Sequence, residues 1–418
     1  MISSIRTYLF LIIASLAIAI VALYPFNNVE LVFLTWEHED TSHTMTINYI
    51  PDSASLTAMV YYDTTSHNGD PASYRYNTQG EVRTYSGVNF NVHSTQLTGL
   101  VPDKTYYFIV GDKTTGYSSE RKFRTVPETG SIRFISGGDA SVSEEFEEVC
   151  KIAAQSNPHF AIIGGDIAYA NGNINSQQLW LELLDIWQDT MVTPDGYTIP
   201  VIAAIGNHEV DASNQPPHKP PTQLLIDNAP FYYMIFHPAA DKTFFKRKIG
   251  KDTTLFMLDT EHIYPSGGEQ LAWMNENFAK HKNDKFRFSS YHVPLYPSFR
   301  DPEDSRNALL RKNWLSVFDQ YHLDVAFENH EHTLKKSRLL RNHQLVDTQG
   351  TIYIGDGNWG RRSRIPVDHW YLEATRPVNH VWAVTLNEDT ASFKALTIDG
   401  IDETFTFEIK ASNNPASP

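Results

Sequence analysis

Side chains that can bind metal ions follow several short apolar segments of this 418-residue chain. They are carboxylates, imidazoles, a phenol and an amide, whose oxygen and nitrogen atoms can coordinate a metal. The residues are Asp139, Asp166, Tyr169, Asn207, His208, His292, His330 and His332. A lone Gly-Asp pair after a strand is usually a turn, and a lone His-x-His is often a surface pair. Five such groups in order along one chain are a more specific pattern, which predicts a metal site.

Hydrophobic patterning predicts the elements that would position these side chains. After residue 131, apolar runs alternate with amphipathic segments, which predicts an α/β domain. The expected strands are Ile132–Ser136, Phe160–Ile163, Ile199–Ile205, Thr254–Leu258, Phe286–Ser290, Leu323–Phe327 and Thr351–Ile354, and the expected helices are Ser143–Ser156 and Leu179–Trp187. Val381–Ile409 alternates like additional antiparallel strands. Because sites in α/β sheets form at the carboxyl ends of strands, we expect the five groups to meet at one edge.

The preceding region, from Val29 to Thr125, has the pattern of an all-β domain. Short runs rich in β-branched and aromatic residues alternate with clusters of Asp, Gly, Ser and Pro. This spacing predicts a seven-stranded sandwich, and Leu100–Tyr107 predicts a corner in which a tyrosine turns back on the chain. We therefore expect an N-terminal targeting segment, a β-sandwich, an α/β domain and a disordered tail, at residues 1–25, 27–126, 131–411 and 412–418.

The ordered motifs resemble the metallophosphoesterase signature, and Tyr169 is similar to the tyrosine that marks the purple acid phosphatase branch. The β-rich region resembles the fibronectin-type-III-like domain that precedes the catalytic domain in the plant-type enzymes. Tyr353–Asn358 is similar to the family's glycine-rich strand exit near the metals. The resemblance implies an N-terminal sandwich followed by an α/β metallophosphoesterase domain, built as a β-sheet sandwich flanked by helices.

The same resemblance implies a binuclear metal centre and assigns its ligands. It gives the first ion Asp139, Tyr169 and His332, the second ion Asn207, His292 and His330, a bridging role to Asp166, and an outer position to His208. Ligand chemistry agrees with this division. Hard anionic oxygens suit Fe³⁺ in the first site, whereas an amide and two imidazoles suit a divalent Fe, Zn or Mn in the second.

Two metal ions can clamp an in-line displacement at phosphorus and turn a bound water into hydroxide, the expected nucleophile. The resemblance thus implies a hydrolase with acid phosphatase activity on small phosphate monoesters. His208 would donate a proton to the leaving oxygen or hydrogen-bond the phosphate, and Asn207 and Arg361 would also contact substrate. A solvated basic turn is an equally good interpretation of Arg361, Arg362 and Arg364.

Three local features depart from the expected pattern or leave it open. Asn329 stands where the last motif usually begins with glycine. The plant enzymes carry substrate-facing histidines after the position of His292, but Pro297–Asp301 contains none. The Pro-rich segment Gln215–Pro221 is either a rim over the site or a plain surface loop.

Composition restricts the class of partner and the compartment. A formal net charge of -15 argues against a protein that binds nucleic-acid backbones. The single cysteine, Cys150, is expected to be a buried apolar residue of a helix. Arg6 precedes an uncharged apolar run, Tyr8–Leu23, which is either a cleaved signal peptide or an uncleaved membrane anchor. Either one would put the rest of the chain outside the cytoplasm, as a secreted, periplasmic or membrane-associated protein.

Two other functions fit part of this pattern. A phosphodiesterase or nucleotidase would use the same centre, because the metals do not distinguish these substrates. An adhesion or interaction module with a vestigial enzyme domain is an alternative of another class. Loss of a ligand would favour that alternative, whereas all seven candidate ligands are present in this chain. The oligomeric state is not indicated by the sequence.

Overall fold

The structure, a computed structural model, describes residues 29–52, 55–114, 116–211, 225–238 and 241–411. The N-terminal segment 1–25, the Pro-rich segment Gln215–Pro221 and the tail 412–418 lie outside these described residues. Within the described ranges, no helix is long and apolar enough to cross a membrane.

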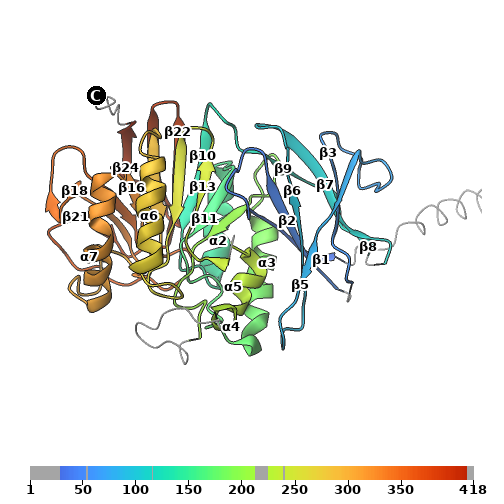
Figure 1. Cartoon of the computed structure of the whole chain (residues 1–418), viewed down its shortest axis with the longest axis horizontal. Coiled ribbons are helices and arrows are strands. Elements are labelled where there is room, and N and C mark those ends of the chain that lie inside the picture. Colours follow the sequence, from blue (N-terminus) through green and yellow to red (C-terminus); the bar gives the residue numbers. More distant parts are fainter. Residues whose placement is uncertain (1–28, 53–54, 115, 212–224, 239–240, 412–418) are drawn as a thin grey trace, which may run out of the picture.

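Two antiparallel sheets form the first part of the chain (Figure 1). Their orders are β1-β2-β6-β5 and β4-β3-β7-β8, with β9 paired to β7. The strands are β1 (Val29–Thr35), β2 (Met45–Pro51), β3 (Met59–Asp63), β4 (Tyr76–Gln79), β5 (Glu81–Arg83), β6 (Val92–Leu97), β7 (Thr105–Asp112), β8 (Gly116–Tyr117) and β9 (Arg121–Arg124). The expected sandwich is confirmed, but the expected number of seven strands is wrong: the described residues of this region form nine. Strands as short as β5 and β8 show no alternation that a sequence pattern could reveal.

The predicted tyrosine corner is confirmed. The hydroxyl of Tyr106, at the start of β7, accepts a hydrogen bond of 2.9 Å from the backbone N–H of Val101. Tyr106 is buried, and its ring stacks on Phe123 of the neighbouring strand β9. The bond therefore fixes the chain reversal that leads into the central strand of this sheet.

Two further sheets form the second part of the chain. The first has the order β12-β11-β10-β22-β23-β24 and the second β13-β14-β15-β16-β20-β17-β21. Their strands are β10 (Ile132–Gly137), β11 (Phe160–Ile163), β12 (Val201–Ala203), β22 (His380–Asn387), β23 (Thr390–Thr397), β24 (Gly400–Lys410), β13 (Phe245–Ile249), β14 (Thr253–Met257), β15 (Phe286–Ser290), β16 (Val325–Phe327), β17 (Leu334–Ser337), β20 (Ile352–Gly355) and β21 (Leu372–Arg376); β18 (Leu340–Arg341) and β19 (Gln344–Leu345) form a small ribbon.

Helices cover the outer faces of both sheets (Figure 1). The helices of this part are α2 (Glu144–Gln155), α3 (Gln177–Thr190), α4 (Leu225–Asn228), α5 (Pro230–Phe236), α6 (Gly268–Lys280) and α7 (Ser305–Gln320), with a short 3₁₀ turn, Ile174–Ser176. Phe134 of β10 and Phe327 of β16 meet between the sheets, whereas Ile135 packs with α2 and Ala326 packs with α7. Strands covered on both faces tend to be apolar at nearly every position, as β11 and β16 are. The predicted sheet sandwich flanked by helices is confirmed.

Helix α2 shows how the local sequence produces one of these layers. Ser143 caps the helix, because its hydroxyl accepts a 3.1 Å bond from the N–H of Phe146. Phe146, Val149 and Ala153 recur at helical spacing and are buried against the sheet. Cys150 lies on the same buried face, and burial raises the pKa of its thiol. The expectation that Cys150 is a buried apolar residue is confirmed.

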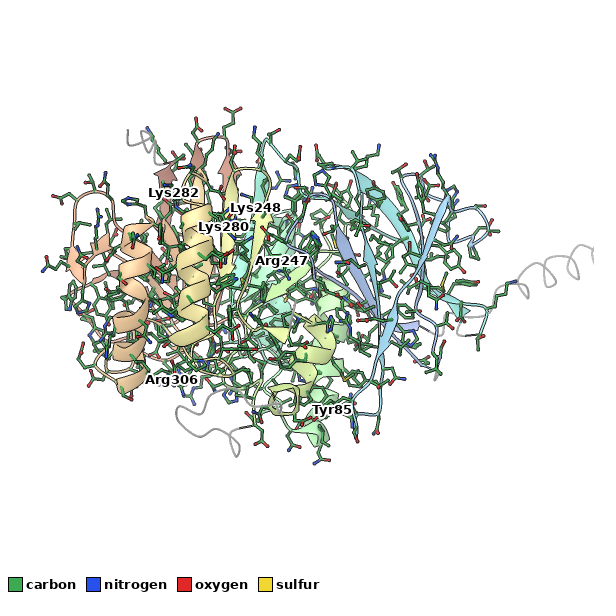
Figure 2. All side chains as sticks on the ribbon, viewed as in Figure 1. Tyr85, Arg247, Lys248, Lys280, Lys282 and Arg306 are labelled. Atoms are coloured by element: carbon green, nitrogen blue, oxygen red, sulfur yellow. The ribbon has the colours of Figure 1, made fainter. Side chains whose placement is uncertain are left out.

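Direct contacts join the sandwich to the helix-flanked sheets. The guanidinium of Arg247, on β13, is buried and donates to the carbonyl of Trp36 in the sandwich. The hydroxyl of Tyr85 donates a 2.7 Å bond to Asp227 of α4, and Figure 2 labels both Tyr85 and Arg247 along this boundary. Phe90 of the sandwich also stacks on Phe231 of α5. The two parts therefore share one continuous core.

The tyrosine corner allows a test of the sandwich. We expect Tyr106→Phe to lower the free energy of unfolding by about 1–2 kcal/mol, because it removes the acceptor of the Val101 N–H and keeps the ring. Urea unfolding followed by tryptophan fluorescence measures this change. The control is Tyr76→Phe, whose exposed ring lies on β4. Equal stabilities of the Tyr106→Phe variant and the parent would show that the corner bond adds nothing.

Candidate metal centre

The predicted ligands come from the carboxyl ends of parallel strands in two different sheets. Asp139, Asp166 and Asn207 follow β10, β11 and β12 of the first sheet, and the three histidines His292, His330 and His332 follow β15 and β16 of the second. The expectation that all five groups meet at one sheet edge was therefore wrong in this detail. They converge because the two sheets pack face to face with these ends on the same side.

One cluster contains Asp139, Tyr169 and His332. The phenol oxygen of Tyr169 lies 3.0 Å from Asp139 Oδ1 and 3.3 Å from His332 Nε2. His332 Nε2 in turn lies 3.0 Å from Asp139 Oδ1. The three atoms form a small triangle of one carboxylate oxygen, one phenol oxygen and one imidazole nitrogen, a donor set suited to a hard trivalent ion.

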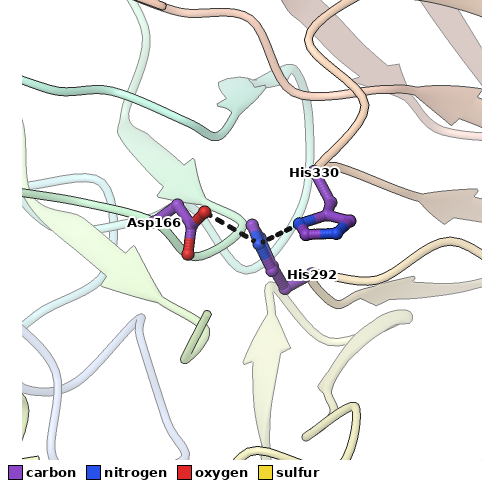
Figure 3. Close-up of side chains that lie close together, drawn as sticks. All are labelled: Asp166, His292 and His330. Carbon is purple, nitrogen blue, oxygen red and sulfur yellow. Dashed lines mark hydrogen bonds and ion pairs between the residues drawn. The ribbon is translucent and has the colours of Figure 1, made fainter. Parts of the chain in front are cut away.

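The other cluster is centred on His292, as Figure 3 shows. Its Nε2 lies 3.1 Å from Asp166 Oδ2, 3.1 Å from Asn207 Oδ1 and 3.0 Å from His330 Nδ1. His292 Nδ1 faces the carbonyl of Gly164 at 3.1 Å, so this nitrogen is the one that carries the proton in the neutral ring. Nε2 then presents a lone pair toward three other acceptors. A cation between them would satisfy all four atoms, so the residues fit a second metal ion.

Backbone conformation also marks these positions. Asp139, Asp166, Tyr169, His330 and His332 all have left-handed φ angles, of 56°, 52°, 59°, 79° and 57°. Residues other than glycine rarely adopt this region, and a bulky residue such as tyrosine does so at a cost. Strain of this kind persists where the surrounding structure holds a functional geometry. Five predicted ligands in one strained conformation therefore support a common role.

Two carboxylates are buried at the centre, and they shift the pKa values of their neighbours. Asp139 and Asp166 are 0% and 1% exposed. Burial opposes a charge on His292, but the adjacent Asp166 outweighs it and raises the pKa of His292 to about 9. Burial, together with the nearby Asp139 and Asp166, also raises the pKa of Tyr169. The phenol therefore keeps its proton and donates it to Asp139 Oδ1, and a metal ion that bound the phenol oxygen would displace this proton.

Glu209 positions the backbone of two loops on one side of the centre. The sequence pattern did not predict this role. Its carboxylate accepts backbone N–H bonds from Asp166 at 2.8 Å, Ile167 at 2.7 Å and Gly206 at 2.8 Å. Burial and the nearby Asp166 raise the pKa of Glu209 to about 8. The side chain thus ties the loop after β11 to the loop after β12 and positions the carboxylate of Asp166.

His208 lies at the open side of the centre. Its backbone N–H donates a 2.8 Å bond to Asp166 Oδ1, and its ring centroid lies 4.2 Å from that of Tyr169. Nδ1 faces the amide oxygen of Asn171, which leaves Nε2 directed toward Asp166 at 3.7 Å. The side chain is one-third exposed, at 33%, so it can reach a bound substrate. Asn171, another residue that the pattern missed, orients it.

Asn329, which replaces the expected glycine, fits because its neighbours are glycines. Its side-chain amide donates a 2.8 Å bond to the carbonyl of Tyr291. A Cβ atom at Gly138 or Gly164 would lie 2.3 Å or 1.9 Å from this amide, so any other residue there would collide with it. Asn329 therefore links the loops from both sheets beneath the metal ligands.

A buried charge network lies below the His330–His332 loop. The ammonium of Lys335 contacts Glu328 and lies 3.0 Å from Asp356 Oδ2, and all three side chains are fully buried. The carbonyl of Asp356 accepts the N–H groups of Glu331 and His332, both at 3.0 Å. The network fixes the backbone of the loop that carries two of the predicted ligands.

One histidine near the centre was also missed. His262 follows β14, whose carboxyl end lies beside that of β15 in the same sheet. It is buried, its Nε2 contacts the hydroxyl of Thr260 at 3.0 Å, and its ring centroid lies 5.6 Å from that of His292. The available signal was its position shortly after the expected strand Thr254–Leu258.

Comparison with protein families agrees with this geometry. Residues 29–125 match the model of the purple acid phosphatase N-terminal domain. Residues 135–334, which contain all seven predicted ligands, match the model of the calcineurin-like phosphoesterases. This chain belongs to the purple acid phosphatase family. Membership implies a binuclear metal centre, and the two clusters are its candidate sites.

Similar proteins extend over most of the chain. Purple acid phosphatase 15 of Arabidopsis thaliana is 22% identical over 76% of this chain and 64% of its own length, so the chain spans less than two thirds of that relative. The purple acid phosphatase PPD1 of yellow lupin has a TM-score of 0.75 at 16% identity, covering 92% of this chain and 74% of its own. PhoD has a TM-score of 0.67 at 12% identity, covering 93% and 90%. At these identities the two structures establish the fold.

Glu209 provides a test of how Asp166 is positioned. Glu209→Gln leaves only one side-chain oxygen to accept three backbone N–H groups, so we expect metal retention to weaken by about 10- to 100-fold. Competition with a chelator, followed by elemental analysis, measures it. The matched control is Glu147→Gln, an exposed residue of α2 paired with Lys151, which should retain metal like the parent. Unchanged retention in Glu209→Gln would contradict the positioning role.

Proposed function

We propose that this chain hydrolyses small phosphate monoesters at a binuclear metal centre. One observation carries the proposal: two adjoining clusters of oxygen and nitrogen atoms that can coordinate a metal, in which neighbouring atoms lie 3.0–3.3 Å apart. Asp139, Tyr169 and His332 would hold the first ion, Asn207, His292 and His330 the second, and Asp166 would bridge them. Fe³⁺ suits the first set, and a divalent Fe, Zn or Mn suits the second.

When bound, such a pair of ions supplies an activated water as nucleophile and positive charge that offsets the charge developing on the phosphoryl group. The protein supplies the rest. Asn207 and Arg361 orient the phosphate oxygens from opposite clusters. His208, held by Asn171, faces the leaving oxygen and hydrogen-bonds or protonates it as the ester bond breaks. The strained loops hold these groups in place before substrate arrives.

The second candidate is a phosphodiesterase or nucleotidase that uses the same centre. Tyr169, Asn207 and His330 are only partly buried, so this side of the centre is reached by solvent and could also be reached by a larger ester. A vestigial enzyme domain is the less favoured alternative, because every predicted ligand lies in one of the two clusters. The extracytoplasmic location, which rests on the apolar N-terminal segment, stays a prediction. The domain boundaries 27–126 and 131–411, which also rest on the sequence, stay predictions too.

Metal content and colour test the centre together. The purified protein should contain about two metal ions per chain, at least one of them iron, and a tyrosinate bound to ferric iron should make it violet to pink. We expect Tyr169→Phe to abolish the visible band, while part of the hydrolysis of a panel of phosphate monoesters survives. Iron-loaded protein without a band, or a band that persists in Tyr169→Phe, would remove Tyr169 from the ligand set.

The role of His208 is tested by the leaving group. His208→Ala should keep both metals yet slow turnover by about 10- to 10,000-fold, because a general acid is lost. The loss should be smaller for esters with acidic leaving groups, which depart without a proton. Turnover is measured with a series of aryl and alkyl phosphates, alongside elemental analysis of each preparation. An equal loss for every ester would instead assign His208 to phosphate binding.

A further inference from the structure

A hollow of about 480 Å³ opens beside the first cluster. His332, a predicted ligand, forms part of its wall, so the hollow begins at the proposed metal site. The rest of the lining comes from Phe299, Arg361, Arg362, Ser363, Arg364 and Ile365. Three of these residues carry guanidinium groups, although the chain as a whole has a net charge of -15. The hollow is therefore a local concentration of positive charge beside the proposed phosphate-binding centre.

The arginine loop is attached directly to the centre. The guanidinium of Arg361 stacks 4.1 Å from the ring centroid of Tyr169 and donates a 3.2 Å bond to the hydroxyl of Ser141. Arg364 donates its backbone N–H to the carbonyl of His332 at 3.0 Å and its side chain to the carbonyl of His330 at 3.3 Å. The position of the loop is therefore fixed relative to the predicted ligands.

The charges of this loop face acidic groups only at longer range: Glu331 and Asp139 both stabilise the charge of Arg364. Within the described part of the chain, none of the three arginines of the loop forms an ion pair, whereas the adjacent Arg300 binds Glu331 at 2.6 Å. Arg362 is exposed and lines the hollow, and among the described residues no side-chain hydrogen bond or ion pair holds its guanidinium elsewhere. Guanidinium groups are the preferred partners of phosphate and carboxylate oxygens, and they stay charged at any physiological pH.

Apolar side chains form another part of the wall. Ile365 is 79% exposed and Phe299 is 38% exposed, and the guanidinium of Arg364 lies 5.2 Å from the ring centroid of Phe299. These groups reduce the water around the arginines when a ligand enters, which strengthens the attraction between opposite charges. The hollow thus combines fixed cations with a partly apolar wall, as expected of a site for an anionic group.

We propose that this hollow binds a second anionic group on the leaving group of the substrate. The inference rests on the proposed function, and it narrows the substrate class to phosphate esters whose alcohol part carries another phosphate or a carboxylate. The scissile phosphate lies at the metal clusters, and the second anion lies against Arg362 and Arg364. Hydrolysis breaks the bond between the scissile phosphorus and the alcohol oxygen, and water supplies the new oxygen of the released phosphate. The alcohol oxygen takes up a proton from His208, and the second anion stays on the leaving group.

The test compares two substrates that differ only in the second anion: propane-1,3-diol bisphosphate and 3-hydroxypropyl phosphate. The parent enzyme should prefer the bisphosphate in kcat/KM by about tenfold or more, and added salt should reduce this preference. Arg362→Ala should lower the ratio of the two kcat/KM values by about three- to tenfold, and Arg362→Glu should lower it further. Arg362→Lys should restore part of it. Arg75→Ala, which removes an exposed arginine in the sandwich, serves as the control and should keep the parent ratio.

The outcomes separate this inference from the proposed function. Hydrolysis of 3-hydroxypropyl phosphate with the same ratio in the parent and in Arg362→Glu would overturn the second-anion site and leave the phosphatase proposal standing. Hydrolysis of neither substrate by metal-replete protein would overturn both. Elemental analysis and thermal unfolding of each variant show whether a lowered ratio comes from the hollow or from a disturbed centre.

Discussion

Two carboxylates buried in one place, Asp139 and Asp166, impose the main constraint on this protein. Moving an ionised carboxylate out of water costs several kcal/mol unless opposite charge or hydrogen bonds replace the lost solvent. Here the replacement is shared between backbone N–H groups and side chains. The N–H of His330 donates to Asp139 at 2.8 Å, and the N–H of His208 donates to Asp166 at the same distance. The remaining oxygens face imidazoles and a phenol, which is where a cation fits.

The loops that carry these two carboxylates and their partners adopt backbone conformations that are rare for residues other than glycine. Left-handed backbone at five predicted ligands brings their N–H groups and side chains to the same point. Glycines make the crowding possible: a Cβ at Gly357 would lie 1.9 Å from Asp139 Oδ2. Such strain is sustained only by a rigid surrounding, and the phenylalanine-rich layer between the two sheets supplies one.

A second set of buried charges supports the first. Lys335, Glu328 and Asp356 neutralise and hydrogen-bond one another below the His330–His332 loop, and Glu331 accepts the N–H of Arg300 at 2.6 Å. Removing one member of a buried ionic network leaves its partners uncompensated, so these residues are as constrained as the ligands above them. The side chain of Arg364 donates to the carbonyl of His330, in the loop above this network, so Arg364 connects the metal centre to the charged hollow.

The sequence determined the chemistry and the class of fold. Asp139, Asp166, Asn207, His292 and His330 could be found because each follows an apolar strand, and strand ends deliver side chains to predictable places. Patterning also predicted α2 and the corner at Tyr106, since both depend on local spacing. Tertiary structure alone decided that these strand ends belong to two sheets, and that Glu209, Asn171 and His262 lie at the centre. Their roles depend on contacts between residues far apart in the chain, such as Glu209 with Asp166, and such contacts leave no local periodicity in a sequence.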